Sequence, residues 1–338
     1  MVWRWNTTDA SLSSEKEVSY NFKVDVEVTD EGGETRTSVS TYPIGFIAIQ
    51  ASYEFSSNHF TPQDEVKATI VRSDLSYVPR EGVGEYRLVS IKQPETVMLP
   101  ENFPVPDVEG KLQTEGDKMR PRWEPDKELL QYLFVFKDDK SVSSGTLNHD
   151  KNGKAEVNFG MLEPGAYRLY YKTKDFWGTE YEKRGDFLVV SPKMQLSVPM
   201  FLFTQKSSFK VGETALVTYG SSIKNQPYWL DIYQSGRLIK RKYLETDQIQ
   251  IEEIPITEEY RGGFSVRIFG VHDYKGYIKT QNIYVPWDNK QLQVSFSKFR
   301  NHLQPGQKET WTVNVKGPNS ELVAAEILAY MYDKSLDM

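Results

Sequence analysis

Apolar and polar residues alternate over short stretches along most of the chain, as at residues 20–28, 167–173, 264–269 and 291–296. Alternation with a period of two places one face of a strand in a core and the other in water, so these stretches are predicted to be antiparallel strands. Turn signals such as Asn152–Gly153 separate them. Only residues 124–130 and 333–337 have a pattern compatible with helix. The chain is therefore predicted to be all-β and built of tandem antiparallel β-sandwiches.

Two sequence patterns recur along the chain at matching intervals. An opening pair of strands is aligned on Pro62, Val211 and Pro305, at steps of 211 − 62 = 149 and 305 − 211 = 94 residues. A closing hairpin begins at Tyr20, Tyr167 and Phe264, at steps of 167 − 20 = 147 and 264 − 167 = 97 residues. Because both series run long and then short, the chain is predicted to be an array of related units.

The repeats divide the chain into four parts. These are the closing part of a truncated unit (1–45), a long complete unit (46–192), a shorter complete unit (193–286) and the opening half of a further unit (287–338). The long unit exceeds its neighbour by about 50 residues. The extra stretch, about 76–130, is rich in proline and glutamate, and we expect it to form long connections with one strand at 85–91.

Charge and composition exclude several classes of function. The net charge is −6, from 41 basic and 47 acidic residues, which disfavours nucleic acid or an anionic membrane as a partner. No apolar run approaches the roughly 18 residues of a membrane span. The first residues do not form a signal peptide. Cysteine is absent, so disulfides, thiolate nucleophiles and cysteine metal sites are excluded.

No motif for catalysis is present. The four histidines, His59, His149, His272 and His302, have no zinc-hydrolase spacing. The glycines of 82–84 do not open a dinucleotide-binding βαβ unit. Adjacent carboxylates, as at 138–139 and 252–253, point to opposite faces of a strand and do not converge on a substrate. We expect no catalytic, cofactor-binding or metal-binding residues, no cofactor and no enzymatic activity.

An oxygen-rich stretch at 150–156 invites a calcium interpretation, but it lacks the glycine and glutamate of an EF-hand loop. A type I′ hairpin at Asn152–Gly153 is the preferred reading. Asp231, Asp273 and Asp288 are scattered and suggest no shared cation.

The 7 tryptophans and 20 tyrosines raise carbohydrate binding as an alternative function. Against it, Trp311 alternates with Val313 and Val315 and is expected in a core. The pairs at 176–177 and 228–229 are expected to cover the ends of sandwiches, whereas Trp3 and Trp5 could be exposed. An adhesin-type spacer of repeated β-sandwiches would show the same periodicity and also stays open.

Several segments resemble the large bacterial α-2-macroglobulin family, especially Bacteroidetes members. They are 285–294 (VPWDNKQLQV), 299–311 (FRNHLQPGQKETW), 324–337 (AAEILAYMYDKSLD) and the hairpin at 26–36. The resemblance implies serial macroglobulin-like sandwiches of the immunoglobulin or fibronectin type, within an endopeptidase inhibitor that traps proteases. It implies proteases and neighbouring macroglobulin-like domains as partners, and a periplasmic or cell-envelope parent whose signal would lie upstream.

In this family, a protease cuts a bait segment, and a Cys-Gln thioester can bind it covalently. Without cysteine, the chain cannot carry the thioester. The bait is expected to follow the strand at 332–337, so the chain is expected to be a scaffold fragment that lacks both regions.

Two expectations concern packing. Short links at Pro192 and Pro286 restrict the backbone, so the complete units should pack end to end and bury some of Phe201, Phe203 and Tyr284. Each truncated unit should lie against a complete unit, through Val24 and Val26 or through Val313 and Val315, or else pair with another copy of the chain.

Overall fold

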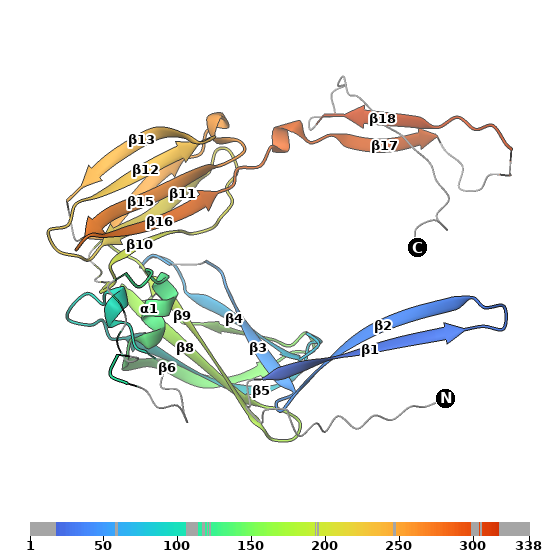
Figure 1. Cartoon of the computed structure of the whole chain (residues 1–338), viewed down its shortest axis with the longest axis horizontal. Coiled ribbons are helices and arrows are strands. Elements are labelled where there is room, and N and C mark those ends of the chain that lie inside the picture. Colours follow the sequence, from blue (N-terminus) through green and yellow to red (C-terminus); the bar gives the residue numbers. More distant parts are fainter. Residues whose placement is uncertain are drawn as a thin grey trace.

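The computed structural model describes residues 18–57, 60–105, 114–116, 119, 121, 123–192, 194, 196–245, 248–298, 304 and 306–317. Antiparallel strands dominate these residues, as the alternation predicts (Figure 1). No helix among them is long and apolar enough to cross a membrane. The predicted helix at 333–337, Trp3, Trp5, His59, His302 and Pro305 lie outside the described residues.

The first half of the described chain holds nine strands, one α-helix and one 3-10 helix. They are β1 (Ser19–Thr29), β2 (Thr35–Gly45), β3 (Ile49–Phe55), β4 (Lys67–Asp74), β5 (Gly82–Ile91), η1 (Pro100–Asn102), α1 (Leu129–Val135), β6 (Asp138–His149), β7 (Lys154–Asn158), β8 (Gly165–Lys174) and β9 (Glu180–Val189).

The second half is built of strands and two 3-10 helices. They are β10 (Met200–Thr204), β11 (Thr214–Ser221), β12 (Tyr228–Gln234), β13 (Arg237–Leu244), β14 (Gln250–Pro255), η2 (Glu258–Tyr260), β15 (Phe264–His272), β16 (Lys275–Ile283), η3 (Asp288–Lys290), β17 (Gln293–Lys298) and β18 (Thr312–Lys316).

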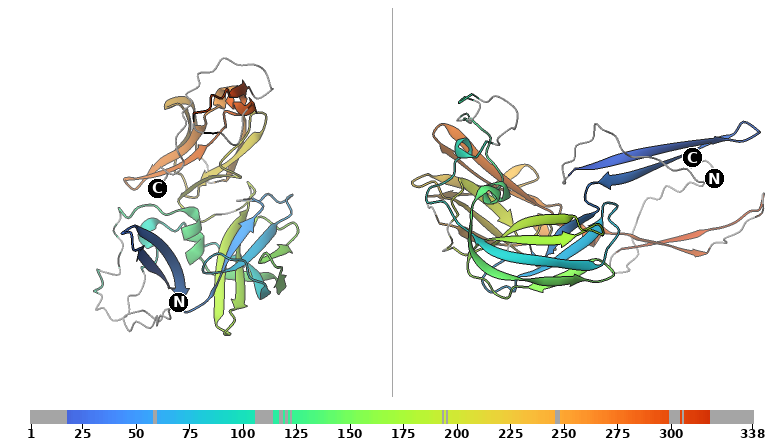
Figure 2. Two further views of the ribbon diagram at one scale, coloured as in Figure 1. Left: turned by 90° about the vertical axis from the view of Figure 1, so that its right-hand side faces the viewer. Right: turned by 90° about the horizontal axis from the view of Figure 1, so that it is seen from below.

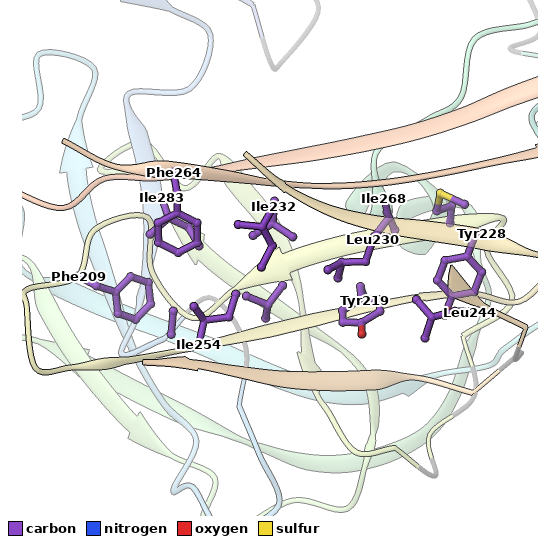
Figure 3. Close-up of a cluster of buried hydrophobic side chains, with 14 of the residues drawn as sticks. Phe209, Tyr219, Tyr228, Leu230, Ile232, Leu244, Ile254, Phe264, Ile268 and Ile283 are labelled. Carbon is purple, nitrogen blue, oxygen red and sulfur yellow. The ribbon is translucent and has the colours of Figure 1, made fainter. Parts of the chain in front are cut away.

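Two sandwiches with the same topology form the body of the molecule. The first sandwich packs the sheet β3-β4-β7 against the sheet β6-β5-β8-β9. The second sandwich packs β10-β11-β14 against β13-β12-β15-β16. Inward side chains of both sheets fill each core; in the second sandwich they include Tyr219, Leu230 and Ile268 (Figure 3). The shared strand order makes the two sandwiches position-by-position counterparts.

The sequence repeat has a direct structural counterpart. Phe60 and Phe209 stand 149 residues apart, the same step as the opening pattern, and both are buried. The Phe60 N–H donates to the carbonyl of Leu188, and the Phe209 N–H donates to the carbonyl of Tyr284, each at 3.0 Å. The opening strand pair of each sandwich is thus tied to its last strand in the same way.

The extra length of the first sandwich lies later in the chain than expected. Within the expected stretch of 76–130, β5 is an integral strand, paired with both β6 and β8. The additional residues are 92–137, between β5 and β6, whereas Ser235–Gly236 alone joins the equivalent β12 and β13. We call residues 92–137 the connecting segment. The strand expected at 85–91 is present, but it belongs to the sheet and not to the extra stretch.

The helix of the connecting segment begins later than predicted. It spans Leu129–Val135, not 124–130, because Pro125 disfavours helical backbone at the residue before it. Glu128 instead caps the helix, and its backbone N–H donates to Oε1 of Gln131 at 2.8 Å.

The turn at Asn152–Gly153 differs from the predicted type I′ hairpin. Of the two residues, only Gly153 has a positive φ, of 68°. The carboxylate of Asp150 instead accepts the N–H groups of Asn152 and Lys154. The flanking strands β6 and β7 belong to different sheets, so the turn crosses between the two layers.

The two end hairpins do not dock as expected. β1 pairs only with β2, and β17 only with β18, among the described strands. Both extend away from the sandwiches (Figures 1 and 2). Val26 is exposed and Val24 half-buried, while Val313 and Val315 are half-buried within their own hairpin. The prediction that these valines pack on a complete unit is therefore wrong, because each hairpin extends away from the adjacent sandwich.

Candidate functional site

The joint between the two sandwiches combines a buried apolar cluster with several buried polar contacts. An apolar cluster joins the two bodies: Ile91, Tyr132, Leu133, Phe136, Ala166, Leu188, Val190, Met194, Leu196, Val198, Phe201 and Ile249. Phe203 packs against this cluster. The predicted burial is confirmed for Phe201, whereas Phe203 is only half-buried, and Tyr284 is 55% exposed and lies outside the joint.

The connecting segment supplies much of this joint. Val97 and Leu99 pack against the core of the second sandwich, while Met98 and Phe103 pack against the joint cluster. The Met98 N–H also donates to the carbonyl of Ser197, in the link between the sandwiches, at 3.0 Å. The connecting segment, which follows β5 of the first sandwich, therefore also packs against the second sandwich.

The connecting segment also binds the short stretch of chain that links the two sandwiches. Ser197 is buried, and its N–H donates to Oε1 of Gln93 at 3.0 Å. Its hydroxyl donates to the carbonyl of Pro94. These bonds tie the link to the start of the connecting segment, so the two run together through the joint.

Two lysines of β16 grip the connecting segment from the second sandwich. Nζ of Lys279 lies 3.1 Å from Oδ2 of Asp126 and donates to the carbonyl of Lys127 at 2.6 Å. The Lys279 and Asp126 side chains are only 9% and 10% exposed. Lys275 donates to the carbonyl of Glu124 and lies 3.9 Å from Oε2 of Glu101. We call this set the lysine clasp.

Burial sets the protonation of the groups around the clasp. Desolvation lowers the pKa of Lys275, and the nearby carboxylates oppose that shift. Burial first, and then the charge of Asp126, raise the pKa of Tyr132. Tyr132 therefore remains protonated and donates to Oδ1 of Asp126 at 2.8 Å, which fixes the carboxylate for Lys279.

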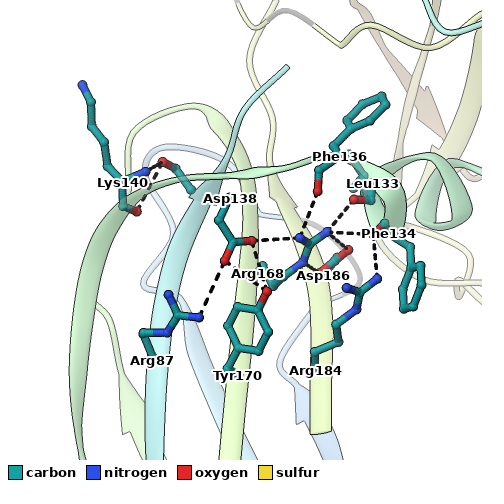
Figure 4. Close-up of polar contacts among 11 residues, drawn as sticks. Arg87, Leu133, Phe134, Phe136, Asp138, Lys140, Arg168, Tyr170, Arg184 and Asp186 are labelled. Carbon is teal, nitrogen blue, oxygen red and sulfur yellow. Dashed lines mark hydrogen bonds and ion pairs between the residues drawn. The ribbon is translucent and has the colours of Figure 1, made fainter. Parts of the chain in front are cut away.

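A buried arginine anchors the end of α1 on the first sandwich (Figure 4). Arg168 of β8 is 2% exposed and pairs with Asp186 of β9 and Asp138 of β6, at 2.9 Å each. Burial opposes its charge, but the hydrogen bonds to Asp186, Tyr170 and Asp138, together with the charge of Asp186, outweigh burial and raise its pKa. Its remaining N–H groups donate to the carbonyls of Leu133 and Phe136. The guanidinium thus satisfies the free carbonyls at the helix C-terminus.

The polar groups of the joint that the structure describes are lysines, carboxylates, side-chain amides and backbone groups, and they contact one another across the two sandwiches. A hollow of about 550 Å³ opens beside it, between Leu99, Pro192 and His272. The arrangement can hold two bodies at one angle.

The histidines and carboxylates considered in the sequence are spread over the fold. His149 is buried beside Tyr171, and His272 contacts Gln226 and lines the hollow beside the joint. Asp138 serves Arg168, while Glu252 pairs with Lys240 and Lys242. No group of three or more metal-ligating side chains occurs among the described residues.

The three scattered aspartates also have separate roles. Asp231 is fully buried and is held by Arg241 at 2.7 Å and Arg267 at 3.0 Å. Asp273 lies near His272, and Asp288 pairs with Arg261.

The aromatic residues are placed differently from expectation. Phe176 and Trp177 do not cover an end of the first sandwich; they are 92% and 75% exposed. Trp311 is 43% exposed and packs on Phe296 instead of in a core. These residues lie at hairpin tips and on a two-stranded ribbon, where no second sheet covers them.

The pair at 228–229 divides between core and surface. Tyr228 is in the core, while Trp229 lies on the outer face and stacks on Phe269 at 4.9 Å. Its edge also meets the ring of Tyr243, so Trp229 is part of an aromatic cluster on the outer face.

The sequence reading missed the lysine clasp. Its signal was present as Lys275, Tyr277 and Lys279, three residues that share one face of a strand through their period of two. Acidic residues in the connecting segment match them, but only the fold brings the two sets together.

Comparison with known proteins bears on this fold. Residues 200–336 match the family model described as the alpha-2-macroglobulin bait region domain. No curated protein sequence matches the chain. The expectation that the chain lacks bait-region sequence gains no support, because the matched model is named for that region.

Several solved structures are similar over most of the chain. Native Escherichia coli alpha-2-macroglobulin aligns with a TM-score of 0.29 and 13% identity, over 90% of this chain and 19% of that one. Salmonella alpha-2-macroglobulin reacted with methylamine aligns at 0.29 and 14%, over 91% and 19%. A tetra-tandem repeat from the extending region of a large adhesion protein aligns at 0.23 and 11%, over 83% and 60%.

The chain thus spans about a fifth of the length of either macroglobulin. The matched residues 200–336 include the whole second sandwich, which repeats the topology of the first. Residues 200–336 are thus similar to the alpha-2-macroglobulin bait region domain, and the described strands form the all-β sandwiches that this likeness implies.

Proposed function

We propose that the chain is a rigid scaffold segment of an alpha-2-macroglobulin-like endopeptidase inhibitor that traps proteases. The observation that carries the proposal is the joint, where the connecting segment and the lysine clasp fix one sandwich against the next. A trap that collapses around a protease needs bodies that move as units, because a loose joint would absorb the motion.

The partners, location and domain limits of the chain are also part of this proposal. Proteases and neighbouring macroglobulin-like domains are the proposed partners, with no nucleic acid and no membrane contact by this segment. The segment itself is proposed to be no enzyme. The periplasm or cell envelope is its proposed location, and a Bacteroidetes-type parent its proposed source. The domain limits 1–45, 46–192, 193–286 and 287–338 are kept as proposed limits.

Trapping has a distinctive readout. A caged protease still cleaves a small chromogenic peptide but no longer reaches a large protein. The test mixes trypsin or elastase with the longest natural protein that carries this sequence, and measures cleavage of azocasein and of a small peptide. We expect azocasein cleavage to fall while peptide cleavage persists.

A variant that weakens the joint between the sandwiches tests whether the scaffold contributes to trapping. Lys275→Met together with Lys279→Met should weaken trapping without changing the initial cleavage of the trap by the protease. Equal loss of both substrate activities would indicate ordinary active-site inhibition and contradict the proposal. Unchanged azocasein cleavage by the natural protein would contradict it as well.

A further inference from the structure

An open hollow of about 760 Å³ lies on the second sandwich, beside the turn between β12 and β13. Its floor is formed by outward side chains of three neighbouring strands: Tyr233 of β12, Ser265 and Arg267 of β15, and Thr280 and Asn282 of β16. Gly262 and Gly263 form one wall. The floor is therefore rich in hydroxyl and amide groups and carries one cation.

The first sandwich has the same positions, and there they are covered. The strand registers make Ser265 and its partner Asn282 the counterparts of Arg168 and Asp186. By the same registers, Arg267 and Thr280 correspond to Tyr170 and Arg184.

On the first sandwich, the C-terminal turn of α1 lies over these positions (Figure 4). Arg168 and Arg184 donate to its carbonyls, among them that of Phe134 at 2.6 Å from Arg184. Arg168 is nearly inaccessible, whereas Thr280 and Asn282 in the second sandwich are exposed.

The difference comes from the connecting segment. In the first sandwich this segment leaves between β5 and β6 and returns as α1 over the outer face. In the second sandwich, Ser235–Gly236 closes the equivalent turn directly. Among the described residues of the second sandwich, nothing takes the place of α1. The hollow therefore corresponds to the surface position that α1 covers on the first sandwich.

We propose that the hollow of the second sandwich binds the C-terminal turn of a short helix carried by another protein. Such a turn presents free backbone carbonyls and the negative end of the helix dipole. In the first sandwich Arg168 and Arg184 receive them; in the second, the counterparts of these arginines are Ser265 and Thr280, and Arg267, beside both in the strand register, supplies the cation. This binding site is independent of protease trapping.

The state of Arg267 supports this role. Its hydrogen bonds leave from Nη2, to Oδ2 of Asp231 at 3.0 Å and to the hydroxyl of Tyr233. Within the described residues, Nη1 has no acceptor, and the side chain is 35% exposed. A carbonyl at Nη1 would gain a charge-assisted hydrogen bond.

The surroundings favour an acidic helix. Arg237 and Arg241 of the adjacent edge strand β13 are exposed and lie one strand away from the floor of the hollow. Buried Asp231 offsets only one of the nearby cations. A second copy of this chain is not the proposed occupant, because the C-terminal carbonyls of its α1 are already taken by its own Arg168.

The test uses the whole chain and a synthetic peptide of residues 124–137, acetylated and amidated, which ends in the turn of α1 and carries a net negative charge. Because α1 already covers the equivalent surface of the first sandwich, the added peptide can bind only in the hollow of the second sandwich. We expect amide shifts in a ¹⁵N spectrum at Ser265, Arg267 and Asn282, while a scrambled peptide causes none.

Three variants make the result specific. Arg267→Gln should weaken binding about tenfold or more, the range of a hydrogen bond to a charged group. Arg237→Gln removes a nearby cation that does not line the hollow, and should leave the affinity within about twofold. Thr280→Trp should fill the hollow and abolish the shifts, while leaving the bond between Asp231 and Arg267 intact.

Three outcomes overturn the proposal: no shift at these amides up to the solubility limit, equal effects of Arg267→Gln and Arg237→Gln, or binding that survives Thr280→Trp. Shifts caused by cello-oligosaccharides instead of the peptide would mark a sugar site and would also overturn it.

Discussion

Replacing Lys279 by methionine should loosen the joint without unfolding either sandwich. Methionine keeps most of the volume of the lysine stem but removes the ammonium group. Asp126 would then hold a nearly buried carboxylate with no cation opposite it. Breaking a buried ion pair from one side typically costs 3–5 kcal/mol, so we expect the joint to lose about 3 kcal/mol.

Hydrogen exchange reads this loss locally. Amides of residues 97–103 and 124–135 are protected only while the connecting segment stays docked, so their exchange should follow its opening. At a tenfold change per 1.4 kcal/mol, a loss of about 3 kcal/mol predicts roughly 100-fold faster exchange. Amides in the core strands β5 and β12 should be unchanged.

A matched control separates burial from charge. Lys172→Met removes the same charge from a pair with Glu182 in which both side chains are about half exposed. Such surface pairs contribute about 0–1 kcal/mol, so exchange in the connecting segment should not change. Adding Asp126→Asn to Lys279→Met should recover part of the loss, because the uncompensated charge is removed. If Lys279→Met and Lys172→Met behave alike, the reasoning on the clasp is refuted.

Three further predictions concern the sandwiches and the first hairpin. The arginines around Asp231 lower its pKa to about 2. The stability that the ionised carboxylate contributes above pH 4 should therefore be lost, by about 2 kcal/mol, as the pH falls from 4 towards 2. Asp231→Asn should remove this pH dependence in acid titrations followed by circular dichroism. Gly84→Ala would place a methyl group against the ring of Tyr171; thermal unfolding should show a loss of about 1–3 kcal/mol, whereas Gly276→Ala, with open space around it, should cost less than 1 kcal/mol. Amides of residues 20–28 should exchange far faster than those of β8 in dilute solution, since their hairpin has no third strand among the described residues; equal protection would contradict this.

Much of the fold could be predicted from local pattern. Alternation identified strands such as β1, β8, β15 and β17, because a half-buried strand imposes a period of two on its own sequence. The repeat register was also visible, since Phe60 and Phe209 fill the same place in equivalent cores.

The joint could not be predicted in the same way. Its contacts pair Lys279 with Asp126, about 150 residues earlier, and no local pattern records such a pairing. The limits of the connecting segment were missed because β5 resembles an isolated strand until its pairing with β6 and β8 is known. Exposure of Phe176 and Trp177 was missed because a turn sequence does not show which way its side chains face.

We propose that the connecting segment holds the two sandwiches at one fixed angle. Residual dipolar couplings test it directly, because bodies that move together share one alignment tensor. The comparison is with a variant in which residues 92–137 are replaced by Ser-Gly, the connection that already suffices between β12 and β13. We expect a single tensor for both sandwiches in the natural chain and two distinct tensors in the variant. Two distinct tensors in the natural chain, or one shared tensor in the variant, would contradict it.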